Sequence, residues 1–564
     1  MSFTADQNKQ IADLIFPQIT ETLADLEQRY PVRKLPEGAV VTRLAPSPTG
    51  FMHVGLLYLA LICSRVTAQS NGVLILRIED TDQKRSIPGA VELIVQSLKD
   101  YEITIHEGLT SLETEVGDYG PYTQSKRANL YQIGIKYLIE QGLAYPCWLS
   151  HEDLEKISQE QNQSKIRPGI YGRFAKWRHA SAEDIITKLK SGDPYEVIRF
   201  RNPGSEKVRR NVVDLVKGKM QQPENDNDIV LFKTSDGLPT YHLAHAVDDH
   251  FMRTTHVIRS DEWVASMTLH YQLFEAFGWT VPQYAQIGPM DKLDNGNRRK
   301  LSKRKDPEAN VMVYDQLGFP RDGVLEYLLN IANSSFEDWK RVHLDANYRE
   351  FEFKLSGLGK SGALIDTKKI ENICKNIIGR MSSDRVYELA LAWAQKYDQE
   401  LAAKMQSEKA YTLQIIGIER GGVEQRKDLA KWSDLRGEIS FFFTDWFEKD
   451  WNETGQAVIA ENLSAFSSEI ISTACRQMIE GYNPEDDKET WITKLKTIAE
   501  GLGYAPDVKL FKQSPEVYKG HFGDIAKIFR VYLTGRNRSP DLYWVMKVLG
   551  TDMVKLRLQR GKAG

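Results

Sequence analysis

The sequence contains little cysteine and no long apolar segment. Of its 564 residues four are cysteines, and they lie far apart at Cys63, Cys147, Cys374 and Cys475. None of them forms the C-x-x-C pair of a zinc ribbon, and so few scattered thiols do not indicate a disulfide framework. No apolar run approaches the ~20 residues that are needed to cross a bilayer. The sequence therefore predicts no structural zinc, no other metal site and no membrane span.

The first residues lack the pattern of a secretion signal, and the composition lacks a strong charge bias. Residues 1–7 do not place a basic stretch before an apolar one, so we expect a cytoplasmic protein. With 74 Lys and Arg against 77 Asp and Glu, the formal net charge is −3. This balance argues against a uniformly basic nucleic-acid binder, but it is compatible with local basic surfaces. A chain of this length predicts about three to five domains.

A strand, a turn, a helix and a second strand follow one another over residues 40–78. An apolar strand leads into a Pro- and Gly-rich turn at 46–50, and a helix begins near Val54. A second apolar strand, 73–78, comes after the helix. This order is half of a nucleotide-binding α/β unit. His53 and free backbone N–H groups lie at the start of the helix, where a phosphate is stabilised.

Motifs in this region and far downstream resemble the signature sequences of class I aminoacyl-tRNA synthetases. Ala45-Pro-Ser-Pro-Thr-Gly50 followed by His53-Val-Gly55 is similar to the glutamyl version of the HIGH signature. Lys300-Leu-Ser-Lys-Arg304 resembles the KMSKS loop of the same family. Arg77-Ile-Glu-Asp-Thr-Asp82 and Pro239-Thr-Tyr-His242 lie between them, and this order makes the resemblance specific. The position after Gly55 departs from the general signature, which has a second His there.

The resemblance implies a fold and an activity. The expected fold is an α/β Rossmann-like catalytic domain with an inserted α+β domain, followed by all-α C-terminal tRNA-binding domains. The expected activity is that of a glutamate–tRNA ligase: ATP activates L-glutamate as glutamyl-adenylate, and the glutamyl group passes to the 3′ end of tRNA-Glu, with release of AMP and pyrophosphate. Mg²⁺ is expected to arrive with ATP rather than in a dedicated protein site. We expect a monomer, with tRNA-Gln as a second candidate acceptor.

Helical and strand patterns along the chain place the boundaries of the expected domains. Apolar residues repeat at helical spacing before the first strand, and from about residue 391 every clear segment has the helical period. The predicted parts are a helical extension, the first half of the catalytic domain, an inserted acceptor-end-binding domain, the second half of the catalytic domain with its Lys-rich loop, a helical connecting domain and an all-α anticodon-binding domain. Their ranges, in this order, are 1–38, 39–142, 143–230, 231–305, 306–390 and 391–564.

The candidate glutamate pocket combines cations, an anion and hydroxyl groups. A guanidinium group can bind a carboxylate through two hydrogen bonds. One Arg lies in the first strand and another at the end of a later strand, so both could reach a substrate carboxylate. A carboxylate would meet the substrate ammonium. By resemblance, the glutamate-binding residues are Arg43, Ser47, Glu79, Tyr241 and Arg259. The alternative is that the two arginines pair with nearby acids such as Asp80 and Asp261.

The candidate ATP site relies on positioning rather than on a strong base. Amino-acid activation is an in-line attack by an already ionised carboxylate, so catalysis consists mainly of orientation and charge stabilisation. The catalytic candidates are His53, Lys300 and Lys303. The ATP-binding candidates are His53, Gly55, Glu262, Lys300, Ser302 and Lys303. Taken alone, the histidine is typical of a turn cap and the lysines of a solvated charge run; their order in the chain favours the catalytic interpretation.

Basic and aromatic residues alternate over 167–178. Such a segment suits phosphate contact combined with base stacking, and an ordinary solvated loop is an equally good interpretation of the pattern alone. The resemblance favours the first, because the insertion of this family grips the acceptor end of tRNA. Residues 533–540 resemble the anticodon-binding end of bacterial glutamyl-tRNA synthetases. The tRNA-binding candidates are Arg167, Arg173, Lys176, Arg178 and Arg536.

Two alternatives remain open on the sequence. His242, His245, Asp248, Asp249 and His250 could place zinc ligands on one helical face, as in a metallohydrolase. The sequence specifies no converging third ligand, and the resemblance instead makes this segment a wall of the substrate pocket. A glutaminyl-type synthetase shares the fold, but its anticodon domain is β-rich, whereas the C-terminal pattern here is helical.

Overall fold

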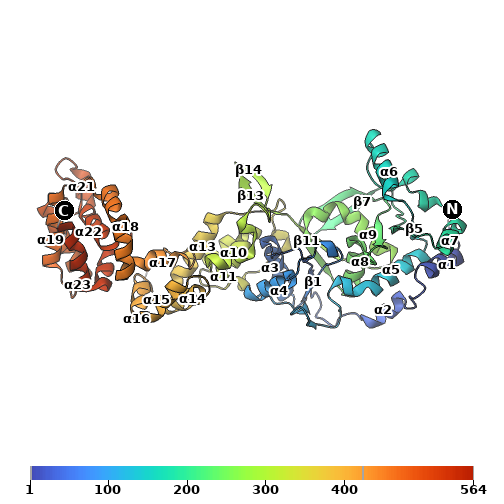
Figure 1. Cartoon of the computed structure of the whole chain (residues 1–564), viewed down its shortest axis with the longest axis horizontal. Coiled ribbons are helices and arrows are strands. Elements are labelled where there is room, and N and C mark those ends of the chain that lie inside the picture. The colour runs from blue at the N-terminus through green and yellow to red at the C-terminus, as the bar shows by residue number, and fades with distance from the viewer. Residues whose placement is uncertain (1–2, 422–424, 563–564) are drawn as a thin grey trace. The chain divides into compact units, whose positions relative to one another are not determined.

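The structure, a computed structural model, describes residues 3–421 and 425–562. The chain forms two compact units, whose elements are labelled in Figure 1. The first unit comprises the chain up to Val313 together with Leu325–Asp366, and the second comprises Tyr314–Val324 and the chain from Thr367 onward. Within the described ranges, no helix is both long enough and apolar enough to cross a membrane.

A parallel sheet lies at the centre of the first unit. β1 (Val41–Leu44) pairs in parallel with β2 (Val73–Leu76), which pairs in parallel with β3 (Glu107–Leu109); β4 (Glu115–Val116) is antiparallel to β3. All residues of β1 and β2 are buried, as expected of parallel strands that are covered on both faces. The connections are α3 (Val54–Gln69) and α4 (Ala90–Asp100). The predicted order of strand, turn, helix and strand is confirmed.

A second sheet lies beside β1. Its parallel strands are β11 (His256–Ser260) and β12 (Gln283–Ile287), and these strands are preceded by α8 (Tyr241–Phe251) and α9 (Met267–Ala276). Thr255 joins the two sheets, because its N–H donates to the Val41 carbonyl and its hydroxyl accepts from the Val41 N–H, both at 2.9 Å. The carboxyl ends of β1, β2 and β11 open onto one cavity, which is where α/β folds bind their ligands.

An antiparallel sheet with short helices interrupts the parallel core. Its order is β10-β9-β6-β5, and its elements, with the helix that leads into it, are α5 (Ala128–Glu140), β5 (Ala144–Cys147), α6 (His151–Gln163), α7 (Ala182–Lys190), β6 (Val197–Phe200), β9 (Val230–Lys233) and β10 (Leu238–Pro239). The hairpin of β7 (Arg209–Asp214) and β8 (Gly218–Pro223) pairs with β12 instead. Part of the segment predicted as an insertion therefore extends the sheet of β11 and β12.

The N-terminal segment forms two helices that pack on α5 and α7. α1 (Ala5–Ile15) and α2 (Leu23–Arg29) each begin with a Thr in a capping box, which satisfies their first free N–H groups. α1 packs against α5 and α7. Lys136 of α5 pairs with Asp13 at 2.8 Å and donates to the Ile19 carbonyl at 2.8 Å.

A β-hairpin precedes the Lys-rich loop. β13 (Met290–Asp294) and β14 (Asn297–Lys300) are joined by Asn295 and Gly296, whose φ angles of 49° and 80° suit the two-residue turn between twisted antiparallel strands. β15 (Ala363–Leu364) pairs in parallel with β13. The helices that follow the loop are α10 (Val311–Leu317), α11 (Arg321–Ala332) and α12 (Ser334–Val342).

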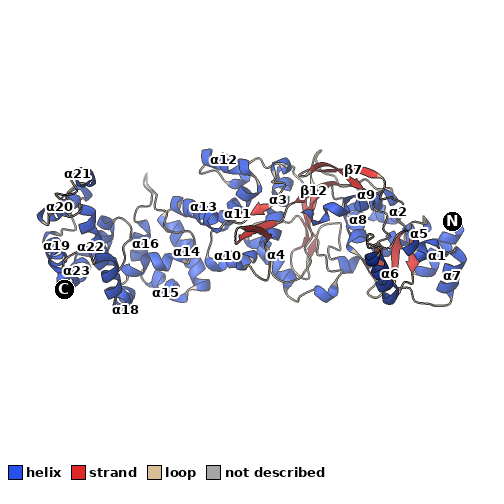
Figure 2. Cartoon of the chain, turned by 90° about the horizontal axis from the view of Figure 1, so that it is seen from above, coloured by secondary structure: helices blue, strands red, loops and turns tan. Residues whose placement is uncertain are grey.

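The second unit is helical. Figure 2 marks helices in blue, and no strand forms among the described residues from Thr367 onward. The helices are α13 (Thr367–Arg380), α14 (Ser383–Tyr397), α15 (Gln399–Ser407), α16 (Lys409–Gly417), α17 (Asp434–Ile439), α18 (Thr444–Leu463), α19 (Ser468–Gly481), α20 (Lys488–Gly501), α21 (Val508–Gln513), α22 (Phe522–Thr534) and α23 (Leu542–Lys562). One buried apolar core runs through them, and α23 bends at Gly550, where φ is 77°. The predicted fold class, with its all-α C-terminal region, is confirmed.

Candidate functional site

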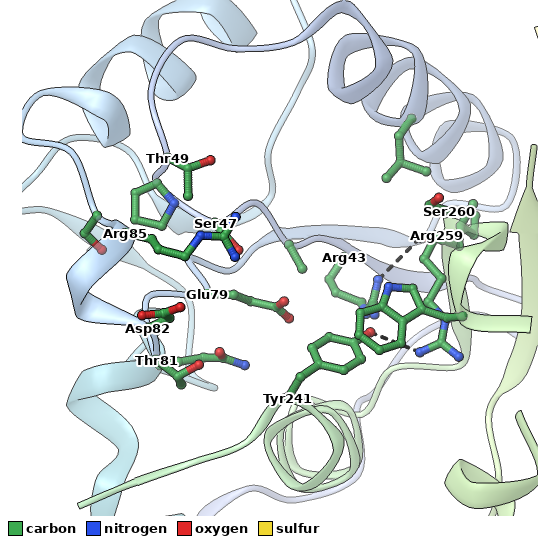
Figure 3. A pocket seen from close by; sticks show the side chains of 17 residues that line it. Arg43, Ser47, Thr49, Glu79, Thr81, Asp82, Arg85, Tyr241, Arg259 and Ser260 are labelled. Carbon is green, nitrogen blue, oxygen red and sulfur yellow. Dashed lines mark hydrogen bonds between the residues drawn. The ribbon is translucent and has the colours of Figure 1, made fainter. Parts of the chain in front are cut away.

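A cavity of about 410 Å³ opens at the carboxyl ends of β1, β2 and β11 (Figure 3). Side chains from strands, from the turn after β1 and from the start of α8 point into it. The structure brings together here all five residues predicted to bind glutamate: Arg43, Ser47, Glu79, Tyr241 and Arg259. Their roles as glutamate ligands stay predictions.

Arg43 is held from beneath the cavity by a residue far away in the sequence. Its Nε donates to Oδ1 of Asp249 at 2.9 Å, and its Nη1 donates to the Ile258 carbonyl at 3.4 Å. The pairing with Asp80 that we considered does not form, because Asp80 accepts from the N–H and hydroxyl of Ser125. Among the described residues, no partner is found for Nη2 of Arg43, which leaves that nitrogen available to a ligand.

Asp249 organises the charges around Arg43. It is fully buried, and its Oδ1 also accepts from Nη1 of Arg77 at 2.8 Å. Arg77 in turn donates to Glu79 at 2.9 Å. Asp249 therefore positions Arg43 directly and Glu79 through Arg77. Burial alone would raise the pKa of Asp249, but Arg43 and Arg77 hold that pKa well below its usual value. Burial raises the pKa of Glu79 despite Arg77 and Arg43.

The His- and Asp-rich segment of α8 is occupied by contacts within the protein. His245 uses Nδ1 toward Asp249 (2.5 Å) and Nε2 toward the Tyr284 hydroxyl (3.0 Å). Asp248 accepts from Arg127 (2.7 Å), and His250 contacts Glu27 at 2.5 Å. Over residues 3–421 and 425–562 no group of three or more His, Cys, Asp or Glu side chains has an arrangement suited to a metal ion. The residues considered as zinc ligands instead hold the arginines and aromatic rings of the core.

Arg259 is buried without a carboxylate partner. Its Nη1 donates to the Tyr241 hydroxyl and its Nη2 to Nδ1 of His270, both at 3.0 Å. In the described part of the chain no acid lies within 4.0 Å of this guanidinium, and Asp261, the alternative partner, pairs with Lys217 at 2.8 Å. A buried charge normally requires an opposite charge. The positive charge of Arg259 therefore faces the cavity uncompensated.

A chain of neutral histidines borders Arg259 and adds no second positive charge beside it. His270 accepts from Arg259 at Nδ1, so its proton lies on Nε2, from which it donates to Nδ1 of His242 at 3.0 Å. Burial, aided by neighbouring positive groups, lowers the pKa of His270 well below its usual value and that of His242 to about 4. Both rings are thus uncharged at neutral pH. Trp263 completes this wall by stacking on Tyr241, with ring centroids 4.0 Å apart.

The first signature segment places His53 at the N-terminus of α3. Nδ1 of His53 accepts from the Gly55 N–H at 2.9 Å, which leaves Nε2 as the protonated nitrogen. A Cβ at position 55 would lie 3.0 Å from Nδ1, so glycine allows this close approach. Burial, together with Lys303 and Lys300, lowers the pKa of His53 to about 4. At neutral pH His53 is therefore a neutral donor at a helix N-terminus, where anions are stabilised.

The second signature segment lies against the first. Lys303 donates to the Phe51 carbonyl at 3.3 Å, and the Val311 N–H donates to the Met52 carbonyl at 3.1 Å. Lys300 pairs with Glu262, another ATP-binding candidate. None of the ATP-binding candidates is among the described residues that line the 410 Å³ cavity. The sequence-predicted residues thus form two neighbouring groups, one around the cavity and one around His53 and the loop.

The tRNA-binding candidates differ in exposure and in their ion-pair partners. Arg173 is paired with Glu160 but 70% exposed, and Arg167 pairs with Asp226. Lys176 is exposed beside the Trp177 ring, 5.7 Å from its centroid. Arg178, in contrast, is tied to the buried Asp228 at 2.5 Å and to the Asn202 carbonyl. In the second unit, Arg536 lines a cavity of about 730 Å³ and donates to Ser440 at 3.0 Å.

Further cavity residues were not predicted from the sequence. Trp263, Thr81, Asp82, Arg85 and Gln124 also line the cavity. A usable signal was present for most of them, because they lie in the segments that follow β2 and β11, and residues beyond the carboxyl ends of parallel strands face ligands. Gln124 had no such signal, since a separate turn brings it to the site.

Two family models match the chain. A model described as tRNA synthetases class I (E and Q), catalytic domain, matches residues 39–372, and one described as an anticodon binding domain matches residues 509–562. These matches, together with the parallel core and the joined signature segments, define a class I tRNA synthetase.

Sequence relatives identify the family more closely. Glutamate–tRNA ligases of Clostridium perfringens (strain 13 / Type A) and Sorangium cellulosum (strain So ce56) are 43% and 44% identical to this chain over 551 and 562 residues. The matches cover 98% and 95% of this chain, and 100% and 97% of those proteins. The chain belongs to the glutamate–tRNA ligase family of class I tRNA synthetases, and the recognition made from the two signature motifs is confirmed.

Solved structures share the fold. The glutamate–tRNA synthetase of Elizabethkingia anophelis superposes with a TM-score of 0.70 at 24% identity, covering 93% of this chain and 100% of that chain. A glutamate tRNA ligase of Elizabethkingia meningosepticum CCUG26117, in complex with its amino acid, gives 0.71 at 24% identity, with 93% and 99% coverage.

Proposed function

We propose that this chain is a glutamate–tRNA ligase that activates L-glutamate with ATP and transfers it to the 3′ end of tRNA-Glu. The observation that carries the choice of amino acid is the buried, uncompensated guanidinium of Arg259 in the cavity. A side-chain carboxylate would supply the missing negative charge through bidentate bonds, with Arg43 as the second cation. Glu79 would bind the substrate ammonium. A neutral glutamine amide would leave Arg259 unbalanced, which disfavours the glutaminyl alternative.

The proposed first step needs orientation and charge stabilisation. An α-carboxylate oxygen of glutamate attacks the α-phosphorus of ATP, the bond from that phosphorus to the bridging oxygen breaks, and pyrophosphate leaves. Nε2–H of His53 would donate to a phosphate oxygen, and Lys300 and Lys303 would stabilise charge on the leaving pyrophosphate. In the second step a terminal hydroxyl of tRNA attacks the acyl carbon, loses its proton, and AMP leaves.

Mg²⁺ fits this site as a companion of ATP rather than as a resident ion. The carboxylates nearest the loop are already paired, Glu262 with Lys300 and Asp306 with Arg299. Mg²⁺ usually retains several waters and binds substrate phosphates together with one or two carboxylates. Bound in this way, it would neutralise phosphate charge.

The tRNA would contact both units. Arg167, Arg173 and Lys176, which lie beside aromatic rings, suit the acceptor end, while Arg178 would mainly support the fold through Asp228. Arg536 and its charged cavity suit the anticodon region. A monomeric state, a cytoplasmic location and the use of tRNA-Gln beside tRNA-Glu remain predictions.

ATP–pyrophosphate exchange tests the activity. We expect exchange that depends on glutamate and increases strongly when tRNA-Glu is present, and no comparable exchange with glutamine. ATP hydrolysis that needs neither amino acid nor tRNA would contradict the proposal and favour a hydrolase.

Replacement of Arg259 tests the pocket. Arg259→Ala should raise the KM for glutamate steeply and narrow the preference for glutamate over glutamine, because a polar site disfavours an analogue that leaves its buried groups unsatisfied. Asp261→Asn is the matched control, since Asp261 pairs with Lys217 and not with Arg259. Steady-state charging with both amino acids measures the preference. An Arg259→Ala enzyme with an unchanged preference and a lower melting temperature would sink the pocket assignment.

A further inference from the structure

Asp306 lies two residues beyond the Lys-rich signature, and it follows a strongly basic segment. Six of the eight residues at 298–305 are Lys or Arg, and Asp306 is the first acid after them. The Asp306 side chain is only 2% exposed. A buried carboxylate is stable only when it is paired, so the contacts of Asp306 determine how the loop is folded.

Asp306 binds the residue that precedes the signature and the backbone within it. Arg299, which precedes the signature lysines, donates from Nη1 and Nη2 to the two carboxylate oxygens at 2.7 and 2.8 Å. The Ser302 N–H donates to Oδ2 at 2.8 Å, and the Asp306 N–H donates back to the Ser302 carbonyl at 3.0 Å. These bonds, above all the one from Arg299, hold the pKa of Asp306 well below its usual value.

The segment after Asp306 is attached to the first signature. Asn310 forms a backbone bridge with His53, and the Val311 N–H donates to the Met52 carbonyl at 3.1 Å. Asp306 therefore lies where the loop joins a segment docked beside His53. A fork of two charge-assisted bonds fixes direction as well as distance.

We propose that Asp306 is a positioning residue that holds Lys300, Ser302 and Lys303 in register with His53, so that the loop binds ATP phosphates in one fixed arrangement. Asp306 itself is buried and acts through Arg299 and the loop backbone. The inference rests on the proposed use of ATP by this loop. It predicts that loss of the Asp306 carboxylate impairs the binding and reaction of ATP and leaves the glutamate cavity intact.

The experiment compares three variants. Asp306→Asn keeps the shape but removes the charge, Asp306→Glu keeps the charge, and Asp294→Asn is the matched control, because Asp294 pairs with the same Arg299 at 2.7 Å but is 49% exposed. A loop misplaced by about 1 Å costs on the order of 10²-fold in rate. We expect Asp306→Asn to lower kcat/KM for ATP by roughly 10- to 100-fold with an unchanged KM for glutamate. Asp306→Glu should recover part of the lost kcat/KM for ATP. Asp294→Asn should have the kinetics of the wild type.

Limited trypsin digestion adds a readout that does not require activity. Cleavage within 298–305, followed by mass spectrometry, should be faster in Asp306→Asn than in Asp294→Asn. Equal cleavage and equal ATP kinetics in these two variants would overturn the inference, as would an increase in the KM for glutamate as large as that for ATP. If the wild type shows no glutamate-dependent exchange, the proposed function fails, while the digestion still tests the loop contact.

Discussion

Asp249 combines several roles at a single residue. Its carboxylate is shared by Arg43, Arg77 and His245, and all four side chains are buried. Burying two arginines side by side is unfavourable unless a negative charge lies between them. The geometry of the cavity walls therefore depends on a group that does not line the cavity.

Replacing Asp249 by Asn should weaken both glutamate binding and the fold. Removal of one partner from a buried ion pair costs about 3–5 kcal/mol, and Arg43 and Glu79 would lose their orientation. We expect a higher KM for glutamate and a lower melting temperature, measured by charging kinetics and calorimetry. Asp248→Asn, on the same helix but bonded to Arg127, Tyr131 and Gln124 rather than to Arg43, should lose stability with a smaller change in KM. An equal change in KM for both variants would contradict this role.

Buried histidines make the stability of the first unit dependent on pH. The pKa of His242 is lowered to about 4 and that of His245 to about 3, chiefly by burial. Between the ordinary value of 6.5 and these values the unfolded chain binds more protons than the folded one, so the free energy of unfolding falls as the pH falls. Their contribution is complete above about pH 6.5 and is lost toward pH 4.

The melting temperature should therefore drop between pH 7 and pH 5, and His242→Gln should flatten part of that drop, because the glutamine amide can accept from His270 without titrating. His151→Gln is the control, since the His151 side chain is 89% exposed. Melting curves across this pH range that are identical for wild type and His242→Gln would show that His242 contributes nothing.

The sequence predicts residues better than it predicts their partners. Arg43 and Arg259 line a common cavity, and the sequence indicates this because both lie near the ends of parallel strands; their binding roles stay predictions. Their partners were not predictable, because Asp249 lies 206 positions from Arg43 and is brought to it only by packing of α8 against the sheet. The spacing of His245 and Asp249 indicated a shared helical face, but whether that face holds a metal or two arginines depends on what packs against it.

At the scale of elements, the Lys-rich loop and the start of α3 act together. Lys303→Ala should lower the rate of adenylate formation by about 10²–10³, because an ammonium that stabilises developing charge is lost, while glutamate binding changes little. Single-turnover kinetics measure this rate. Lys305→Ala is a suitable control in the same loop; a Lys303→Ala enzyme that reacts as fast as this control would assign Lys303 to the solvated surface.

The structure contains helices and strands where a periodic pattern or a signature in the sequence predicts them. The β7–β8 hairpin is the instructive exception. Its residues lie within the predicted inserted segment, yet they pair with β12 at Asp214 and Tyr284. Strand patterns show where a strand lies along the chain, but its neighbour in the sheet is set by tertiary packing. Sheet membership therefore had to come from the structure.

At the scale of the whole molecule, each unit has its own core, so each should have its own unfolding transition. Ile528→Ala in α22 removes a fully buried side chain of the second unit and should lower that unit's free energy of unfolding by about 2–5 kcal/mol. Leu74→Ala in β2 is the matched change in the first unit. Calorimetry should show the two variants shifting different transitions. A single transition lowered equally by both would mean that the units unfold as one.

The uncompensated charge of Arg259 also affects the enzyme before any substrate arrives. A buried guanidinium without an acid beside it attracts small anions from the surrounding solution, and we expect one of them to balance its charge in the resting state. Glutamate would then bind by displacing that counter-ion from the cavity. Its apparent affinity is set by the anions it competes with as well as by the fit of its own carboxylate. If Arg259 selects the amino acid as proposed, the same guanidinium makes glutamate binding sensitive to the ionic composition of the solution.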